Sequence, residues 1–417
     1  MSGQTLSRRR FLAAAGLSTA AALGACAMNG IPTFTPASTA TPNGSPAQIG
    51  PYDVNRMILG EEAQIPLGLP QPIPPEFNLL SYYECIDGQA QNAPPPSQVS
   101  AAVYYPVYRA PGANVTDHRV PTPNPLNLTL GPYPILLYAH GFRDTFYSCT
   151  VASSPQRDFT SVDAMLSHVA SYGVVCVAPN LSWVRSAIGG GGSHDFNYSE
   201  RGAFGMRAKV LTLYWLYFAN QLNTTMFAQQ LDLSHLILVG HSTGAGGAIQ
   251  AGRELSKIVS FRSIAYGLIG PVSDTTAADV RNLLVLGGTR DTLQLGVNPQ
   301  GAYQAATTPK TLVTISGANH FGYTDLCDAS NVCQPYGIND PSGTISRADQ
   351  QLTGGAYLAA LARYYALGDK TARRYLTGER AVEGLEALSI QVQQEGYRIE
   401  EYKTPPIGWP TLEPAGP

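Results

Sequence analysis

Short runs of consecutive apolar residues recur along the chain from about residue 133 onward. Such runs, when bounded by Gly, Pro or polar residues, are typical of strands that are buried on both faces of a sheet. The strands expected on this pattern are Ile135–Tyr138, Val174–Ala178, Leu236–Val239, Ser263–Leu268, Leu283–Leu286 and Leu312–Ile315.

Stretches with helical apolar spacing lie between these runs. The expected helices are Val162–Ser171, Arg201–Gln221, Ala245–Leu255, Ala302–Ala306 and, last, Gln350–Tyr365. Strands that alternate with helices predict the α/β class: a mostly parallel central sheet with helices on both faces.

The N-terminal part of the chain has a different pattern, because 18 of the 32 prolines fall between residues 27 and 130. Proline interrupts helices, so extended segments and edge strands are expected here, for example Val99–Tyr105. We expect a flexible Thr/Pro/Ser-rich linker at 27–55, a single folded domain with a Pro-rich N-terminal extension at 56–375, and a C-terminal tail at 376–417.

Residues 1–25 are typical of an export signal. Arg8-Arg9-Arg10-Phe11-Leu12 precedes a short, Ala-rich apolar run, and this pattern resembles a bacterial twin-arginine signal. Leu23-Gly24-Ala25-Cys26 resembles a lipoprotein cleavage box, which makes Cys26 the candidate lipidation site and new N-terminus. The alternatives are plain cleavage or an uncleaved anchor. We expect an exported protein that is secreted, or held to the cell envelope by this N-terminal lipid alone.

Composition excludes several classes of function. A net charge of −3 gives no basic surface for nucleic acid, and a hydrophobic fraction of 44% is typical of a globular protein. No Cys/His spacing resembles a zinc site, so neither a metal nor a cofactor is predicted.

Five cysteines remain after Cys26. Cys176 lies in an apolar run and is expected to be a buried free thiol. The other four could form two disulfides in an oxidising compartment, or could all be free thiols. Among the possible pairings we favour Cys327 with Cys333, which leaves Cys85 with Cys149.

The most informative motif is Gly240-His241-Ser242-Thr243-Gly244, which lies between an expected strand and an expected helix. A strand, a tight turn flanked by glycines and a helix form the context in which a serine hydroxyl is presented as a nucleophile. A serine needs a histidine that takes its proton and an acid that orients the histidine.

Asp291 and His320 each follow an expected strand, in the chain order Ser, Asp, His that this context requires. The predicted catalytic residues are therefore Ser242, Asp291 and His320. Weaker rivals for the acid are Asp274 and Asp325, and for the base His168, His194 and His235.

Acyl transfer also requires hydrogen-bond donors for the developing oxyanion. The amide of Thr243 is one candidate, and the amide of Phe142, after the strand that ends in His140-Gly141, is the other. His140 is expected to anchor this loop. The residues that could line a substrate pocket are Trp183, in the long loop at 181–199, His241 beside the serine, Phe321 and Tyr323. Aromatic residues at such places are as often simple packing.

Four motifs together are similar to those of the α/β-hydrolase superfamily: His140-Gly141-Phe142, the turn at Ser242, Gly288-Thr289-Arg290-Asp291, and Gly317-Ala318-Asn319-His320-Phe321. The branch they resemble holds dienelactone-hydrolase-like enzymes, chlorophyllases, platelet-activating-factor acetylhydrolases and bacterial polyester hydrolases. The resemblance covers residues 95–370 and implies an α/β-hydrolase fold and ester hydrolysis without a cofactor. Polyester hydrolases usually have Met at the position of Thr243, and a Trp beyond the next strand where this chain has Gly270-Pro271-Val272.

The sequence therefore predicts a serine hydrolase that cleaves small-molecule or lipid-like carboxylic esters through an acyl-enzyme. One alternative is a lipase or acyltransferase that acts on lipid or polyester substrates. A second alternative is a cell-envelope lipoprotein that binds a ligand without turnover.

Overall fold

The computed structural model describes residues 44–59, 101–107, 119–120, 132–141, 158–181, 203–271, 277–293, 299–325, 327–330 and 340–397. All of them belong to one compact unit. The predicted signal peptide and Cys26 lie outside the described residues.

The described residues form a ten-stranded sheet with the order β10-β9-β8-β7-β6-β4-β5-β2-β1-β3. Its centre consists of parallel strands: β4 (Tyr133–Ala139), β5 (Val175–Pro179), β6 (Leu231–His241), β7 (Ser263–Ile269), β8 (Leu283–Gly288) and β9 (Lys310–Ile315). Beyond β5 lie β2 (Ala101–Val107), β1 (Asp53–Leu59) and β3 (Arg119–Val120), and beyond β9 lies β10 (Ile390–Glu395). The pairs β5–β2, β2–β1 and β9–β10 are antiparallel.

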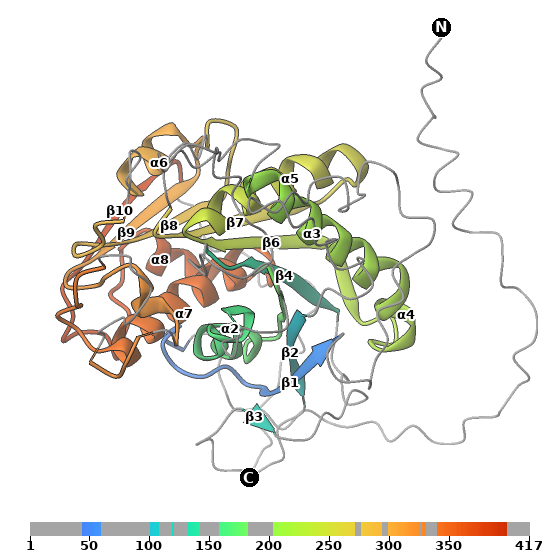
Figure 1. Cartoon of the computed structure of the whole chain (residues 1–417), viewed down its shortest axis with the longest axis horizontal. Coiled ribbons are helices and arrows are strands. Elements are labelled where there is room, and N and C mark those ends of the chain that lie inside the picture. Colours follow the sequence, from blue (N-terminus) through green and yellow to red (C-terminus); the bar gives the residue numbers. More distant parts are fainter. Residues whose placement is uncertain are drawn as a thin grey trace, which may run out of the picture. The chain divides into compact units, whose positions relative to one another are not determined.

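Helices cover both faces of the sheet (Figure 1). On one face lie α3 (Ala203–Tyr217), α5 (Thr243–Ile258) and α6 (Pro299–Ala305), and on the other lie α2 (Asp163–Ala170), α7 (Arg347–Tyr365) and α8 (Arg373–Leu376). The short elements are η5 (Asp158–Thr160), the π-helical η6 (Phe218–Leu222), α4 (Asn223–Thr225), η7 (Phe321–Tyr323) and η8 (Lys370–Ala372).

Each face of the sheet has its own hydrophobic core, because neighbouring residues of a strand point to opposite faces. In β6, Leu236 and Leu238 pack in the cluster that contains α3 and α5, whereas Ile237 and Val239 pack in the cluster that contains α2 and α7. Continuous apolar runs therefore mark strands buried on both sides. The predicted α/β class, with its mostly parallel sheet between two helical layers, is confirmed.

The predicted elements from residue 133 onward all occur, and most extend by a few residues at their ends. The expected strand Leu236–Val239 is the carboxyl half of β6, and the expected helix Ala245–Leu255 is the centre of α5. The predicted strand Val99–Tyr105 corresponds to β2, but β2 lies inside the sheet, between β5 and β1, and is not an edge strand.

The predicted linker at 27–55 extends too far, because the chain is already packed at residue 44. Ser45 is buried, the amide of Gly50 donates to Ser171 Oγ at 2.9 Å, and His168 Nε2 donates to the carbonyl of Pro46 at 2.6 Å. These polar contacts with α2 and the turn after it hold the segment, a feature that its Pro- and Ser-rich composition conceals.

The predicted tail at 376–417 also belongs in part to the folded domain. β10 pairs with β9 from Ile390 to Glu395, and Thr311 Oγ1 lies 3.0 Å from the hydroxyl of Tyr397. The backbone of β10 forms a sheet ladder even though most of its side chains are exposed. For this reason its sequence lacks the apolar run that marks the other strands.

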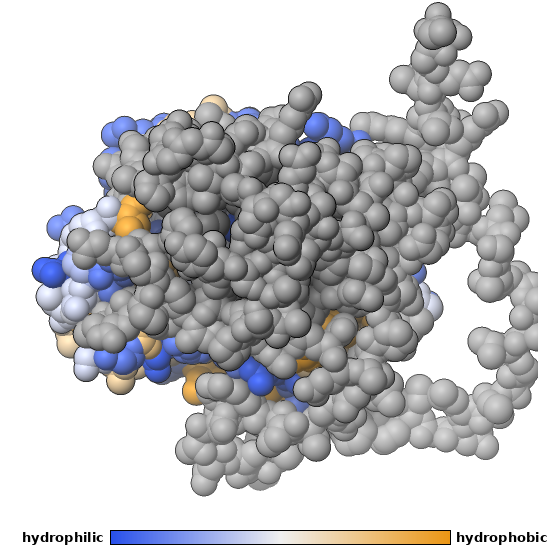
Figure 2. All heavy atoms as spheres, in the orientation of Figure 1, coloured by the Kyte–Doolittle hydropathy of each residue, from blue (hydrophilic) through white to orange (hydrophobic). Residues whose placement is uncertain are grey.

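Described residues on the face in Figure 2 are mostly hydrophilic, with a few hydrophobic ones between them. Ile49 and Ile258 are the large hydrophobic side chains that are exposed in the described part of the chain. Among the helices of the described residues, none is both long and apolar enough to cross a bilayer.

Candidate active site

Ser242 lies at the sharp turn between β6 and α5. Its backbone has φ 55° and ψ −123°, a conformation that residues other than glycine rarely adopt. The turn is tight because strand and helix approach closely: a Cβ on Gly240 would lie 2.1 Å from the carbonyl oxygen of Gly244, and one on Gly244 would lie 2.0 Å from that of Ala139. Both flanking glycines are therefore required by the space available.

The amino end of α5 begins directly after Ser242. The first amides of a helix have no acceptor within the helix, and the helix dipole makes this end electropositive. Thr243 is the first residue of this 16-residue helix. An oxygen that becomes negatively charged beside Ser242 would therefore meet a favourable field and the amide of Thr243.

His320 and Asp291 form a buried pair at the carboxyl ends of β9 and β8. The distance between His320 Nδ1 and Asp291 Oδ2 is 2.9 Å, and the two side chains are 1% and 0% exposed. Asp291 also accepts the amide of Leu293 at 3.1 Å. Because Nδ1 donates to the carboxylate, Nε2 is the ring nitrogen of His320 that remains for proton transfer.

Two contacts connect this pair with Ser242. The amide of Ser242 donates to the carbonyl of Ile269 at 2.9 Å, and a Cβ on the next residue, Gly270, would lie 2.9 Å from Asp291 Oδ2 and 3.1 Å from His320 Nδ1. His241, just before Ser242, donates from Nε2 to the carbonyl of His320 at 2.9 Å, and the two rings are 4.7 Å apart. The structure thus brings the three predicted catalytic residues to one end of the sheet.

The two histidines of the site have pKa values that are shifted in opposite directions. Burial and the neighbouring His320 lower the pKa of His241 to about 3, so His241 is neutral. Burial also acts to lower the pKa of His320, but the charge and hydrogen bond of Asp291, together with the charge of Asp340, outweigh it and raise this pKa. His320 is therefore the residue suited to take up a proton.

The loop after β4 faces Ser242, since a Cβ on Gly141 would lie 2.8 Å from Ser242 Cβ. As predicted, His140 anchors this loop: its Nε2 accepts the amide of Leu181 at 2.7 Å, and its Nδ1 donates to the carbonyl of Gly141 at 2.9 Å. The predicted oxyanion donor Phe142 and the predicted pocket residue Trp183 lie outside the described residues.

Arg207 was not singled out from the sequence, yet it is 1% exposed and contacts the same loop. Its guanidinium donates to the carbonyls of His140 and Gly141 at 3.3 Å each. Arg207 lies on α3, which packs against α5. No sequence pattern around Arg207 predicts its contact with the loop after β4.

A second group that the sequence did not indicate supports the loop of His320. Asp340 accepts the amides of His320 and Phe321 at 3.1 and 3.0 Å. Gln350, on α7, accepts the amide of Asn319 at 3.2 Å and donates to its carbonyl at 2.7 Å. Because Asp340 and Gln350 contact main-chain atoms, no sequence motif predicts their role.

The predicted pocket residues that the structure describes lie beside His320. The ring of Phe321 is 4.9 Å from that of His320 and 6.0 Å from that of His241. His241, Phe321 and Tyr323 are 2%, 6% and 0% exposed. His241 and Tyr323 are therefore buried packing residues whose rings contact each other, and His241 also contacts the ring of His320.

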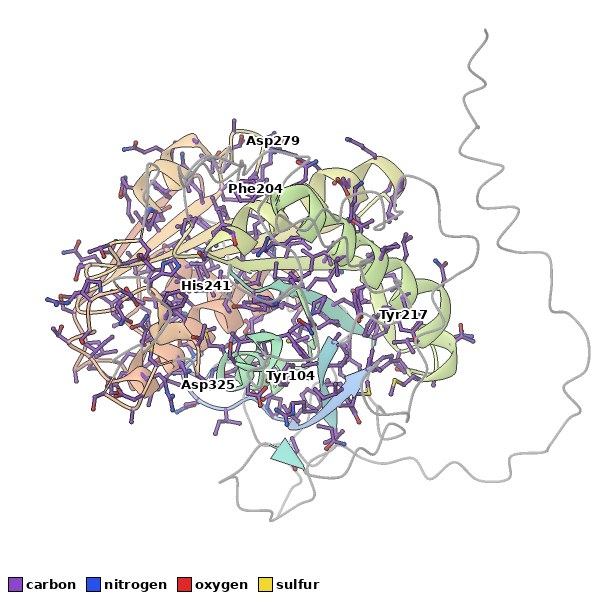
Figure 3. All side chains as sticks on the ribbon, in the orientation of Figure 1. Tyr104, Phe204, Tyr217, His241, Asp279 and Asp325 are labelled. Atoms are coloured by element: carbon purple, nitrogen blue, oxygen red, sulfur yellow. The ribbon has the colours of Figure 1, made fainter. Side chains whose placement is uncertain are left out.

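The described rival residues have other partners. Asp325 accepts from Gln351 at 3.0 Å and lies apart from His241 in Figure 3. His235 pairs with Asp232 at 2.6 Å, and His168 contacts Pro46. Asp274 and His194 lie outside the described residues.

The described part of the chain contains no group of three or more His, Cys, Asp or Glu residues that could hold a metal ion. Cys176 is a buried free thiol, as predicted, and burial raises its pKa. Cys327 is disulfide-bonded. Because Cys333, Cys85 and Cys149 lie outside the described residues, the predicted pairings stay predictions.

Comparisons with known proteins do not place the chain: no protein-family model matches it, and no curated protein matches it significantly.

Proposed function

We propose that the protein is a serine hydrolase of the α/β-hydrolase fold that cleaves carboxylic esters through an acyl-enzyme. One observation carries the proposal: Ser242, on a strained turn at the amino end of α5, lies at the same end of the sheet as a buried His320–Asp291 pair, to which Gly270 and His241 connect it. The parallel order of β6, β7, β8 and β9 supports it, because the carboxyl ends of such strands meet at one edge of the sheet.

In the proposed first step, Ser242 Oγ attacks the ester carbonyl carbon while its proton passes to His320 Nε2. The new C–O bond forms and the carbonyl π electrons move to the oxygen, which the Thr243 amide stabilises together with the predicted donor Phe142. The tetrahedral intermediate then expels the alcohol, which receives the proton from His320.

In the second step, water attacks the acyl-enzyme and gives its proton to His320. Collapse of the second intermediate breaks the bond to Ser242 Oγ, returns the proton to it and releases the acid. Asp291 keeps its negative charge throughout and stabilises the imidazolium form of His320. None of these steps calls for a metal or cofactor.

The Arg8-Arg9-Arg10 segment and Cys26 support a proposed location at the cell envelope, with export by the twin-arginine route and a lipid at Cys26. Radioactive palmitate should label the wild-type protein and not the Cys26→Ser variant. Equal labelling of both proteins would refute lipidation at this cysteine.

The test of the activity is hydrolysis of p-nitrophenyl esters from acetate to palmitate by the protein and by Ser242→Ala. The proposal expects turnover that falls to background in the variant, and labelling of Ser242 by a fluorophosphonate probe. The chain-length optimum then separates an esterase from a lipase, and added alcohol acceptors reveal acyl transfer. A wild-type protein that neither turns over an ester nor reacts with the probe would favour the binding lipoprotein.

A further inference from the structure

The peptide backbone of His320 is held on both sides by side chains that are distant in sequence. Its N–H donates to Asp340 Oδ1 at 3.1 Å, and its carbonyl accepts from His241 Nε2 at 2.9 Å. We propose that Asp340 and His241 are positioning residues that fix His320 for proton transfer. This inference rests on the proposed hydrolase function.

Asp340 uses both of its carboxylate oxygens. Oδ1 accepts the amide of His320, and Oδ2 accepts the next amide, that of Phe321, at 3.0 Å. A single carboxylate therefore sets the orientation of two consecutive peptides, one of which carries the imidazole. An asparagine has no charge and a single acceptor oxygen, so it cannot reproduce the two separate, charge-assisted bonds that Oδ1 and Oδ2 accept.

The segment that contains Asp340 is itself fixed against the same loop. Asn319 Nδ2 donates to the carbonyl of Pro341 at 3.1 Å, and Arg290 Nε donates to the carbonyl of Ser342 at 2.9 Å. The amide of Thr344 donates to the carbonyl of Gly317 at 2.8 Å. These bonds join residues 341–344 to the turns that carry Asp291 and His320. A shift of the backbone at Asp340 would therefore also shift the catalytic pair.

His241 holds the other side of the His320 peptide. It is 2% exposed and neutral, so its Nε2–H donates at any pH at which the enzyme would work. Its ring also packs against the imidazole, with 4.7 Å between the ring centroids. His241 adjoins Ser242 in the chain, and this contact therefore couples the position of the nucleophile to that of the base.

Position matters here because proton transfer requires the donor and acceptor atoms to lie within hydrogen-bond reach, and small displacements cost large factors in rate. The titratable groups that act on His320 are the carboxylates of Asp291 and Asp340 and the neutral His241. Tyr323 packs against His241, and burial raises its pKa, so its hydroxyl stays neutral. Loss of the charge of Asp340 should therefore lower the pKa of His320.

The first experiment compares Asp340→Asn with Asp279→Asn, which removes an equal charge from a surface ion pair with Arg253 that lies apart from His241 in Figure 3. For Asp340→Asn we expect kcat to fall about tenfold, KM to stay within about twofold, and the acid limb of kcat/KM to move to lower pH. The Asp279→Asn control should keep the wild-type profile. An Asp340→Asn protein that loses only thermal stability, with kcat and acid limb unchanged, would overturn the role of Asp340.

Asp340→Glu provides a second variant, which remains informative if Asp340→Asn does not fold. The longer side chain keeps the negative charge but shifts the acceptor atoms. We expect the acid limb to return to that of the wild type while kcat stays reduced. Two results would contradict this division between charge and geometry. One is an acid limb in Asp340→Glu that is displaced as far as in Asp340→Asn, and the other is a wild-type kcat in Asp340→Glu.

His241 is tested with a pair of variants. His241→Phe keeps a ring against His320 but removes the Nε2–H donor, whereas the amide of His241→Gln can still donate. We expect kcat to fall about tenfold in the Phe variant and clearly less in the Gln variant. Equal losses in both would show that the hydrogen bond to the His320 carbonyl does not position the base.

A titration that does not depend on activity separates this inference from the proposed function. The imidazole signal of His320 is assigned in NMR spectra as the one lost in His320→Gln. If no ester is cleaved by the wild type, the proposed function fails, yet a lower His320 pKa in Asp340→Asn would still support the contact of Asp340 with His320. An unchanged pKa would overturn it, whatever the activity.

Discussion

At the scale of single residues, the positive φ of Ser242 is a local backbone strain that the surrounding structure imposes. Among the described residues, Ala228, Gln229, Ser242 and Asn282 are the ones other than glycine with positive φ. Of these, Ser242 alone lies at the junction of a buried strand and a helix, where its amide is fixed by the carbonyl of Ile269. A conformation of this kind is worth about 1–3 kcal/mol of strain.

The strain predicts a difference between two inactive variants of Ser242. Both Ser242→Ala and Ser242→Gly remove the hydroxyl, and hydrolysis should fall to background in both. Glycine adopts positive φ without strain, so the Gly variant should have a free energy of unfolding about 1 kcal/mol greater than that of the Ala variant. Urea unfolding measures this, and a less stable Gly variant would contradict the strain.

The raised pKa of His320 predicts the pH dependence of the reaction. The base works only as neutral imidazole, and this form is lost as the pH falls through the pKa of His320. Because Asp291 and Asp340 together outweigh the opposing effect of burial, the acid limb of kcat/KM should have its midpoint above 6.5, the ordinary value. A pH–rate profile with a neutral ester checks this, and a midpoint below 6.5 would show that burial dominates.

At the scale of elements, the site depends on how closely the strand ends approach one another. Gly270, after β7, has φ +48° and lies against both members of the buried pair, where a Cβ would be 2.9 Å from Asp291 Oδ2. Gly384 also has positive φ, +95°, but a Cβ there would meet only Ala47 Cβ at 3.8 Å. The two glycines therefore share a backbone strain and differ in what surrounds them.

We expect Gly270→Ala to lose most of its kcat and Gly384→Ala to keep it. Both variants should be destabilised by about 1 kcal/mol through positive φ, and Gly270→Ala by more, because its methyl group presses on Asp291 and His320. The comparison of kcat with thermal unfolding checks this. Normal activity in Gly270→Ala would mean that Asp291 and His320 accommodate the methyl group without losing their catalytic geometry.

The sequence predicted the central elements well because their signal is local. The strands β4 and β8 and the carboxyl half of β6 are apolar and buried, since helices cover both faces. β10 was missed because its sequence, Ile-Gln-Val-Gln-Gln-Glu, has few apolar residues, and only the free edge of β9 makes it a strand. β1 was not singled out either: the predicted linker, which ended at residue 55, took in its polar first residues, and its apolar end fell in the Pro-rich extension.

The same division holds for the candidate site. Ser242, Asp291 and His320 could be located because each lies shortly after an apolar strand, in the expected order. Asp340 and Arg207 could not, because each acts on backbone atoms of a distant loop: Asp340 on amides 19 and 20 positions away, and Arg207 on carbonyls 66 and 67 positions away. A sequence pattern can locate a residue by its place after a strand or within a turn, whereas the contacts of Asp340 and Arg207 are made only after folding.

At the scale of the whole molecule, the C-terminal segment connects the edge of the sheet with the candidate site. β9 leads directly into the turn that carries His320, and β10 covers the outer edge of β9 along its whole length. The amide of Ser316, at the start of that turn, donates to the carbonyl of Ser389 at 2.9 Å. Beyond β10, Tyr397 packs against Tyr364 of α7, with 6.1 Å between the ring centroids.

This arrangement predicts that two truncations differ sharply. A chain that ends after Leu388 lacks β10 and leaves the backbone groups of β9 unpaired, which invites association through the exposed edge. It should unfold at lower temperature, form aggregates and lose activity, because the turn at Ser316 is no longer fixed. A chain that ends after Tyr397 keeps β10 and is the matched comparison. Size-exclusion chromatography, thermal unfolding and ester hydrolysis measure the difference, and equal behaviour of the two chains would show that β9 holds the His320 turn without β10.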